Sequence, residues 1–181
     1  MSEELEVLKA VTRRLTGTGI PYMITGSMAA NFYAVPRMTR DIDIVVDVAE
    51  SDVDRLIGLF QDDFYVDRDT VQEAVRAKGM FNIIHNAFVI KVDFVVRKDS
   101  DYRRTEFSRR KGVSVEGCDL FLVAPEDLII SKLDWARDSH SEVQLSDVRN
   151  LLARVEGLDH AYLVHWITRL GLESLYREVS R

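Results

Sequence analysis

The sequence predicts an α/β fold whose last third is entirely helical. Short apolar runs alternate with amphipathic segments over the first two thirds of the chain, and helical patterns alone follow Pro125. The 181 residues, 46% of them apolar, suffice for one substantial core and are too few for two ordinary domains and a linker. We therefore expect one compact unit, with an α/β core over residues 1–123 and a helical lobe over 124–181 packed on it.

Periodicity and end residues justify each element. Apolar residues recur at helical spacing from Leu5 to Leu15, and Ser27, after Gly26, is placed to cap a helix. Two strand-like runs flank a turn at residues 86–87, which predicts a hairpin. The expected elements are helix 3–16, strand 20–25, helix 28–33, loop 34–40, strand 41–47, helices 52–60 and 70–77, hairpin 80–96, two short strands within 113–123, and helices 125–138, 142–155, 159–169 and 171–179.

The composition limits the function classes. With 24 basic and 30 acidic residues the net charge is −6, so no global positive field attracts nucleic acid or an anionic membrane. The single cysteine, Cys118, excludes an intramolecular disulfide and fits a reducing compartment. The N-terminal segment lacks the pattern of a signal peptide, and no apolar run approaches the roughly 18 residues that span a bilayer. We expect a cytoplasmic protein with no membrane partner.

Asp41 and Asp43 stand two apart in a strand-like segment, which places both carboxylates on one face of the strand. Two adjacent like charges are costly unless a cation neutralises them. Mg²⁺ suits such a pair, because it prefers carboxylate oxygens and takes further ligands from substrate phosphates. The alternative is a solvated edge strand whose outer face is acidic.

Two further features accompany this acidic pair. Gly26-Ser27 lies at a predicted strand-to-helix turn, where free N–H groups and the helix dipole favour a phosphate. Asp93 lies within an apolar strand, where an unpaired charge is expensive to bury. The alternative is that Asp93 faces solvent. Lys91 suggests this, because it lies two residues earlier and hence on the same face of the strand. Each feature alone is common, and their combination is much more specific.

This combination resembles the signature of the DNA polymerase beta-like nucleotidyltransferase superfamily. Within the superfamily the sequence is similar to small bacterial enzymes related to AbiEii-type toxins. The resemblance touches residues 20 to 172 and is carried by four segments: 24–30, 36–43, 124–133 and 147–152. It implies a mixed β-sheet flanked by helices, with a C-terminal helical lobe.

The resemblance also implies roles for individual residues. Asp41 and Asp43 would hold two Mg²⁺ or Mn²⁺ ions, with Asp93 binding one of them and helping to deprotonate the acceptor. Gly26, Ser27 and adjacent N–H groups would hold the terminal phosphates. The phosphates would also be contacted by Lys132, Arg37 and Arg40. The alternatives are a solvated helix face for the lysine and pairing with nearby acids for the arginines.

The implied activity is transfer of a nucleoside monophosphate from a nucleoside triphosphate to a hydroxyl of an unknown acceptor, which is RNA, protein or a small molecule. The lobe is short and carries no motif that identifies the acceptor. A non-catalytic nucleotide-binding or toxin–antitoxin interaction module of the same fold is therefore the alternative, and a homodimer stays open.

Other known motifs fit the same residues less well. A haloacid dehalogenase-like phosphatase requires an apolar strand leading into Asp41, which residues 36–40 do not form. An EF-hand would require a glycine and a distal glutamate that the sequence lacks at the necessary positions.

The basic segment 97–111 is expected to be a solvated helix face, or else a guide for RNA with Tyr102 or Phe107 for stacking. The four histidines have no metal-ligand spacing with the cysteine. The aromatic residues of the lobe, including Trp135 and Trp166, are expected to pack inside the lobe or against a second copy of the chain.

Overall fold

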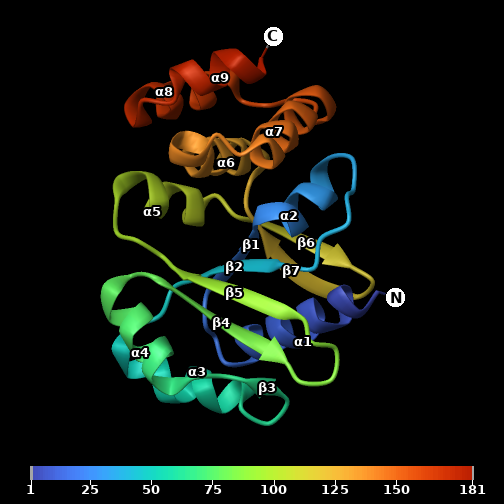
Figure 1. Ribbon diagram of the computed structural model, residues 1–181, viewed down its shortest axis with the longest axis vertical. Coiled ribbons are helices and arrows are strands. Elements are labelled where there is room, and N and C mark those ends of the chain that lie inside the picture. Colours follow the sequence, from blue (N-terminus) through green and yellow to red (C-terminus); the bar gives the residue numbers. More distant parts are fainter. Residues whose placement is uncertain (1, 181) are drawn as a thin grey trace.

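The computed structural model describes residues 2–180, which form one seven-stranded mixed sheet with helices on both faces (Figure 1). The strands lie in the order β3-β4-β5-β2-β1-β7-β6. They are β1 (Tyr22–Thr25), β2 (Ile42–Val46), β3 (Phe64–Tyr65), β4 (Met80–His85), β5 (Lys91–Val96), β6 (Lys111–Val115) and β7 (Cys118–Leu122).

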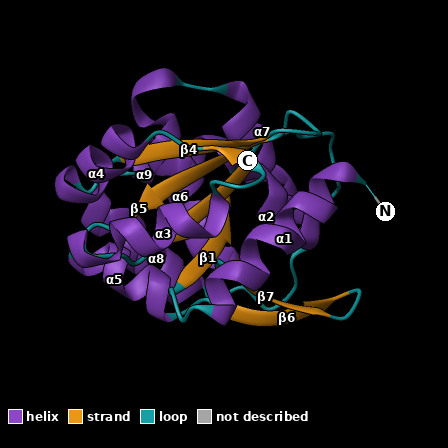
Figure 2. Cartoon of the chain, turned by 90° about the horizontal axis from the view of Figure 1, so that it is seen from below, coloured by secondary structure: helices purple, strands orange, loops and turns teal. Residues whose placement is uncertain are grey.

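The helices divide between the two faces of the sheet. They are α1 (Glu3–Gly17), α2 (Gly26–Tyr33), the 3-10 turn η1 (Glu50–Asp52), α3 (Val53–Phe60), α4 (Arg68–Ala77), α5 (Asp101–Ser108), α6 (Pro125–Ser139), α7 (Glu142–Arg154), α8 (His160–Leu170) and α9 (Glu173–Val179). In Figure 1 the helices α2 and α5–α9 lie above the sheet, whereas α1, α3 and α4 lie below it. Figure 2, seen from below, shows these lower helices in front of the strands.

The central strands of the sheet have one face toward the lower helices and one toward the upper helices. β1 pairs antiparallel with β2, and β2 pairs parallel with β5. Ile42, Ile44 and Val46 are buried while the alternate positions of β2 are only partly buried. Phe94, in register with Ile44, contacts the ring of Phe60 on α3. The apolar side of these strands therefore faces the lower helices, and the alternate side faces α2 and the C-terminal helices.

The structure confirms the predicted fold class, a mixed sheet flanked by helices with helices alone after Pro125. The short strand β3 was not predicted, because two residues are too few to show an alternating pattern. The prediction that Ser27 caps α2 was wrong. The cap position is Thr25, which makes no side-chain cap hydrogen bond, and Ser27 lies in the first turn.

The structure also corrects expectations for aromatic residues. Tyr102 and Phe107 are buried beneath their helix and are not available to stack on RNA. Trp135 is exposed and so does not pack within the lobe, and its packing on a second copy stays a prediction, whereas Trp166 is buried as expected. Within residues 2–180, every helix falls short of the length and apolarity that a bilayer crossing demands.

Candidate active site

Asp43 and Asp93 are direct neighbours on the parallel strands β2 and β5, where their Cα atoms are partners in the register. Residues paired in this way project from the same face of a sheet. Asp41 lies just before β2, in phase with Asp43, and its side chain is 63% exposed. The three predicted acids therefore lie together on the side of the sheet that faces α2.

Lys91 connects two of these acids. Its Nζ lies 2.7 Å from Oδ2 of Asp93 and 3.8 Å from Oδ1 of Asp41. The hydrogen bond to Asp93 raises the pKa of Lys91, so the ammonium stays charged at neutral pH. The sequence suggested that Lys91 points the same way as Asp93, and it does, as the ion-pair partner of the acid.

Gly26 lies directly against the Asp43 carboxylate. Its φ of 64° lies in the left-handed region, and a Cβ added there would be 2.0 Å from Oδ2 of Asp43. Only glycine lets the strand-to-helix turn approach the acid this closely. The turn and the acids thus form one compact unit, although Gly26 and Asp43 are far apart in the sequence.

Asp43 carries a strongly perturbed carboxyl group. Burial, together with repulsion from Asp93 and Asp41, raises its pKa to about 6, and attraction to Lys132 and Lys91 offsets only part of this rise. The surroundings of Asp43 therefore supply too little positive charge to stabilise the ionised form of its carboxyl group. Perturbation of this kind, by burial and by like charges, is typical of functional sites.

Lys132 reaches this region from α6. It is 2% exposed, and its Nζ donates to Oδ2 of Asp147 at 2.8 Å and to Oε1 of Gln144 at 2.9 Å. Burial lowers the pKa of Lys132, and the bond to Asp147 opposes this. A solvated position for Lys132 is therefore wrong, because the side chain is enclosed between α6 and α7.

Arg37 completes a chain of contacts from α2 to α7. Its guanidinium donates to both carboxylate oxygens of Asp147, at 3.0 and 3.2 Å, and to the Ser27 hydroxyl. The side chain of Asn31 bonds the backbone N–H and C=O of Arg37 and so fixes the loop. The pairing with an acid that was the alternative for Arg37 is thus observed, whereas Arg40 is exposed and its role stays a prediction.

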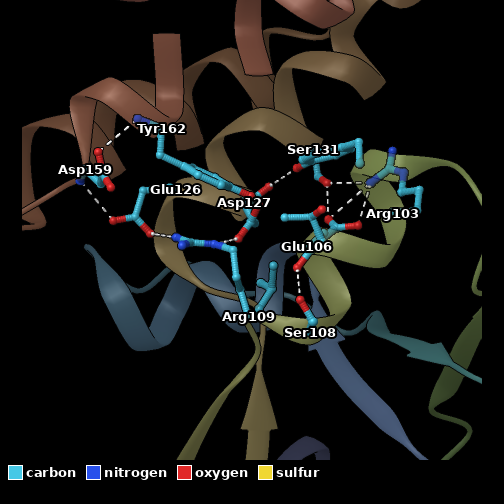
Figure 3. A network of polar contacts seen from close by, with 12 residues as sticks. Arg103, Glu106, Ser108, Arg109, Glu126, Asp127, Ser131, Asp159 and Tyr162 are labelled. Atoms are coloured by element: carbon cyan, nitrogen blue, oxygen red, sulfur yellow. Dashed lines mark hydrogen bonds and ion pairs between the residues drawn. The ribbon is translucent and has the colours of Figure 1, made fainter. Parts of the chain in front are cut away.

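A buried polar network holds α6 in place (Figure 3). Arg103 on α5 donates to Glu106 and to Ser131, and Ser131 in turn donates to Glu106. One turn earlier on α6, Asp127 accepts from Arg109 at 2.8 Å and from the Tyr162 hydroxyl at 2.5 Å. Because α5, α6 and α8 are joined through paired charges, the position of Lys132 relative to the sheet is well defined.

A cleft of about 540 Å³ opens between the sheet and the lobe. This volume lies within the range of roughly 300–1,000 Å³ that is usual for ligand sites. One end is lined by Gly26 and Asp43 from the core and by Lys132 and Gln144 from the lobe. The cleft therefore joins the acidic cluster to the long face of α6.

Within residues 2–180, no group of three or more His, Cys, Asp or Glu side chains is arranged closely enough to enclose a metal ion. The Lys91 ammonium instead contacts both Asp93 and Asp41.

Asp147, Gln144 and Asn31 were not assigned a role from the sequence. Asp147 belongs to one of the resembling segments, and it is a charged residue on a helix face that also carries Leu145, Val148 and Leu151. A charge among buried apolar positions indicates a buried partner, and this signal was present. Its partners could not be identified, because Arg37 is 110 residues away.

Comparison with solved structures finds the same architecture at low sequence identity. An antigenic nucleotidyltransferase-like protein from Paracoccidioides brasiliensis is 22% identical over 83% of this chain and 75% of its own, with a TM-score of 0.54. The antibiotic-resistance factor ANT(2'')-Ia has a TM-score of 0.59 over 98% of this chain and 95% of its own, at 11% identity. This chain has the nucleotidyltransferase fold.

A third structure with the nucleotidyltransferase fold is the lincosamide antibiotic adenylyltransferase LnuA with lincomycin bound. It is 12% identical over 83% of this chain and 96% of its own, with a TM-score of 0.54. No protein-family model and no curated protein matches the sequence. The likeness at these identities establishes the fold, and the chemistry of the site has to be argued from the side chains.

Proposed function

We propose that this chain is a metal-dependent nucleotidyltransferase, which transfers a nucleoside monophosphate from a nucleoside triphosphate to a hydroxyl group of an acceptor. The observation that carries the proposal is the pairing of Asp43 and Asp93 on adjacent strands, beneath the Gly26 turn and beside the Lys132 cleft. Solved proteins of this fold include adenylyltransferases, which supports nucleotidyl transfer as the type of reaction.

The donor groups are of the kind that a divalent cation prefers, and they could gather around one once Lys91 leaves Asp93. Asp41, Asp43 and Asp93 supply carboxylate oxygens on one side of the sheet, the ligands that Mg²⁺ and Mn²⁺ prefer. The raised pKa of Asp43 reflects burial and repulsion from Asp93 and Asp41, and a bound cation would offset both. When bound there, the metal would neutralise the triphosphate and favour ionisation of the acceptor hydroxyl.

The side chains have distinct tasks in this proposal. Lys132 and the N–H groups after Gly26 bind the phosphates and orient the donor. Asp93 accepts the proton of the acceptor hydroxyl, whose oxygen forms a bond to the α-phosphorus. The bond from the α-phosphorus to the bridging oxygen breaks, and pyrophosphate leaves with that electron pair. Arg37 positions Ser27 and Asp147 by its hydrogen bonds.

A second candidate is a nucleotide-binding module without turnover, for example in a toxin–antitoxin pair. It is favoured by Lys91, which already compensates the charge of Asp93. Catalysis requires this ammonium to leave Asp93. Because the Lys91 side chain is 43% exposed, that movement meets little packing resistance.

The test is label transfer from each α-labelled nucleoside triphosphate, with Mg²⁺ or Mn²⁺, to total RNA, to protein and to small molecules. We expect transfer by the wild type and a loss of at least about a hundredfold in Asp43→Asn, since the cluster loses a charged ligand. Asp119→Asn removes an exposed strand carboxylate on β7 and is the matched control. Metal-dependent binding without transfer to any acceptor would instead select the second candidate.

A further inference from the structure

Trp135 is the largest exposed apolar side chain of the lobe. It is 57% exposed, although the nearby residues Leu133 and Ala136 of α6 are fully buried. The other tryptophan, Trp166, is 7% exposed and packs against the ring of Tyr102. Packing therefore accounts for Trp166 but not for Trp135, because an exposed indole gains nothing from the core.

The position of Trp135 relative to Lys132 is fixed by the helix. Side chains three residues apart lie on the same side of an α-helix, about one turn from each other. Both residues line the 540 Å³ cleft. A ligand whose phosphates are held at Lys132 and that extends along α6 therefore meets the indole next.

The cleft is also lined by the end of α4 and the start of β4, with Ala77, Gly79 and Met80, and by Val95 of β5. The charged residues Lys78, Arg97 and Lys98 belong to the same lining. Met80 is 46% exposed, and its thioether is a polarisable group that packs well on aromatic rings. The indole of Trp135 and the thioether of Met80 thus line the same cleft, and both groups suit a flat, partly apolar ring.

We infer that Trp135 is the stacking platform for the nucleobase of the donor nucleotide, in the cleft that Met80 also lines. This inference rests on the proposed function, in which Lys132 binds the phosphates of the donor nucleotide. It adds a binding site for the nucleobase of the same donor. Every base has a π-face, so stacking of this kind binds all four nucleotides with only modest preference.

The test compares nucleoside triphosphates with inorganic tripolyphosphate, which has the phosphates but no ring. Binding of both is measured by calorimetry in the presence of Mg²⁺ for the wild type, Trp135→Ala and Trp135→Phe. Stacking is worth about 1–3 kcal/mol per base, so Trp135→Ala should weaken nucleotide binding by roughly 5- to 150-fold. Tripolyphosphate should bind the variant as it binds the wild type. Trp135→Phe should recover most of the nucleotide affinity.

Fluorescence gives a direct readout, because the chain has only two tryptophans. Nucleotide should quench the emission of the wild type, tripolyphosphate should not, and the quenching should disappear in Trp135→Phe, which retains Trp166. Val164→Ala, which truncates an exposed apolar residue on α8, is the control for a general effect of the lobe surface.

The outcomes separate the two proposals. If nucleotide and tripolyphosphate affinities fall together in Trp135→Ala, or if neither changes, the stacking role is overturned while the proposed function stands. A wild-type dimer that dissociates in Trp135→Ala with unchanged nucleotide affinity would make Trp135 an interface residue and also overturn the inference. If the wild type binds neither compound, the proposed function itself fails.

Discussion

At the scale of single residues, Gly26 has the most restrictive environment of the site. Its backbone has a positive φ, and its Cα lies against the Asp43 carboxylate with no room for a methyl group. Two separate costs follow from any substitution. A left-handed backbone costs an L-residue about 1–2 kcal/mol, and the added carbon must also displace the acid.

Gly26→Ala should therefore destabilise the protein and abolish metal-dependent nucleotide binding, because Asp43 can no longer stay beneath the turn. Gly19→Ala is the matched control, since Gly19 has a similar φ of 70° but nothing within 4 Å of an added Cβ. Urea denaturation should show a loss of about 1–2 kcal/mol for Gly19→Ala and a larger loss for Gly26→Ala. If Gly26→Ala and Gly19→Ala lost the same stability and bound nucleotide equally well, the contact between Gly26 and Asp43 would not be needed for function.

At the scale of elements, the attachment of α6 to α8 depends on a buried acid. Asp127 is 0% exposed and accepts hydrogen bonds from Tyr162 and Arg109. Burial raises the pKa of Asp127, and these two hydrogen bonds oppose the rise. The charged form is therefore tolerated only because both donors are present.

Tyr162→Phe should destabilise the fold by about 1–3 kcal/mol at pH 8, because a buried charged acceptor loses a donor. The substitution raises the folded-state pKa of Asp127 further, whereas the unfolded value stays near 3.8. An acid with a raised folded pKa binds its proton more tightly when folded, so the penalty is complete above the folded pKa and fades as pH falls toward the unfolded pKa.

Urea denaturation between pH 4 and pH 8 measures this difference. Tyr176→Phe removes a hydroxyl from α9, outside the network, and is expected to show a smaller and pH-independent change. A Tyr162→Phe effect of equal size at both ends of the pH range would mean that the ionised form of Asp127 is not what the hydroxyl stabilises.

The elements also show what a sequence can and cannot predict. Helical periodicity and the alternation of β2 identified nearly every element, because these patterns depend on local geometry. The acidic cluster followed from residues two apart on one strand and from a single acid within an apolar strand. By contrast, the contact of Gly26 with Asp43 and the bonds of Arg37 and Lys132 to Asp147 depend on how distant elements meet, which no local pattern contains.

The exposure of Trp135 was unpredictable for the same reason. On α6 the spacing of Lys132, Trp135 and Asp138 is that of one helix face, and an aromatic residue there is normally a core residue. Whether that face meets the sheet or a cleft is decided by α5 and α8, which hold α6 through the network of Figure 3.

At the scale of the whole molecule, the proposed ligand site is shared between the sheet and the lobe. Asp43 and Gly26 belong to the core, whereas Lys132 and Trp135 belong to α6, and all four line one cleft. A nucleotide that contacts both sides should stabilise both. Ligand at a hundred times its dissociation constant adds about 2.7 kcal/mol to the free energy of unfolding. For a chain of this size that corresponds to a rise in melting temperature of about 5–10 °C.

We expect this rise with nucleoside triphosphate and Mg²⁺ together, and almost none with either alone or in Asp43→Asn, because phosphate binding needs the metal-bound acids. Hydrogen exchange locates the effect. Amides of β2 and of α6 should both gain protection on binding, while those of α1, which lies on the lower side of the sheet and lines no part of the cleft, should change little. Protection restricted to the sheet would show that the ligand does not reach α6, and neither Lys132 nor Trp135 would then belong to its site.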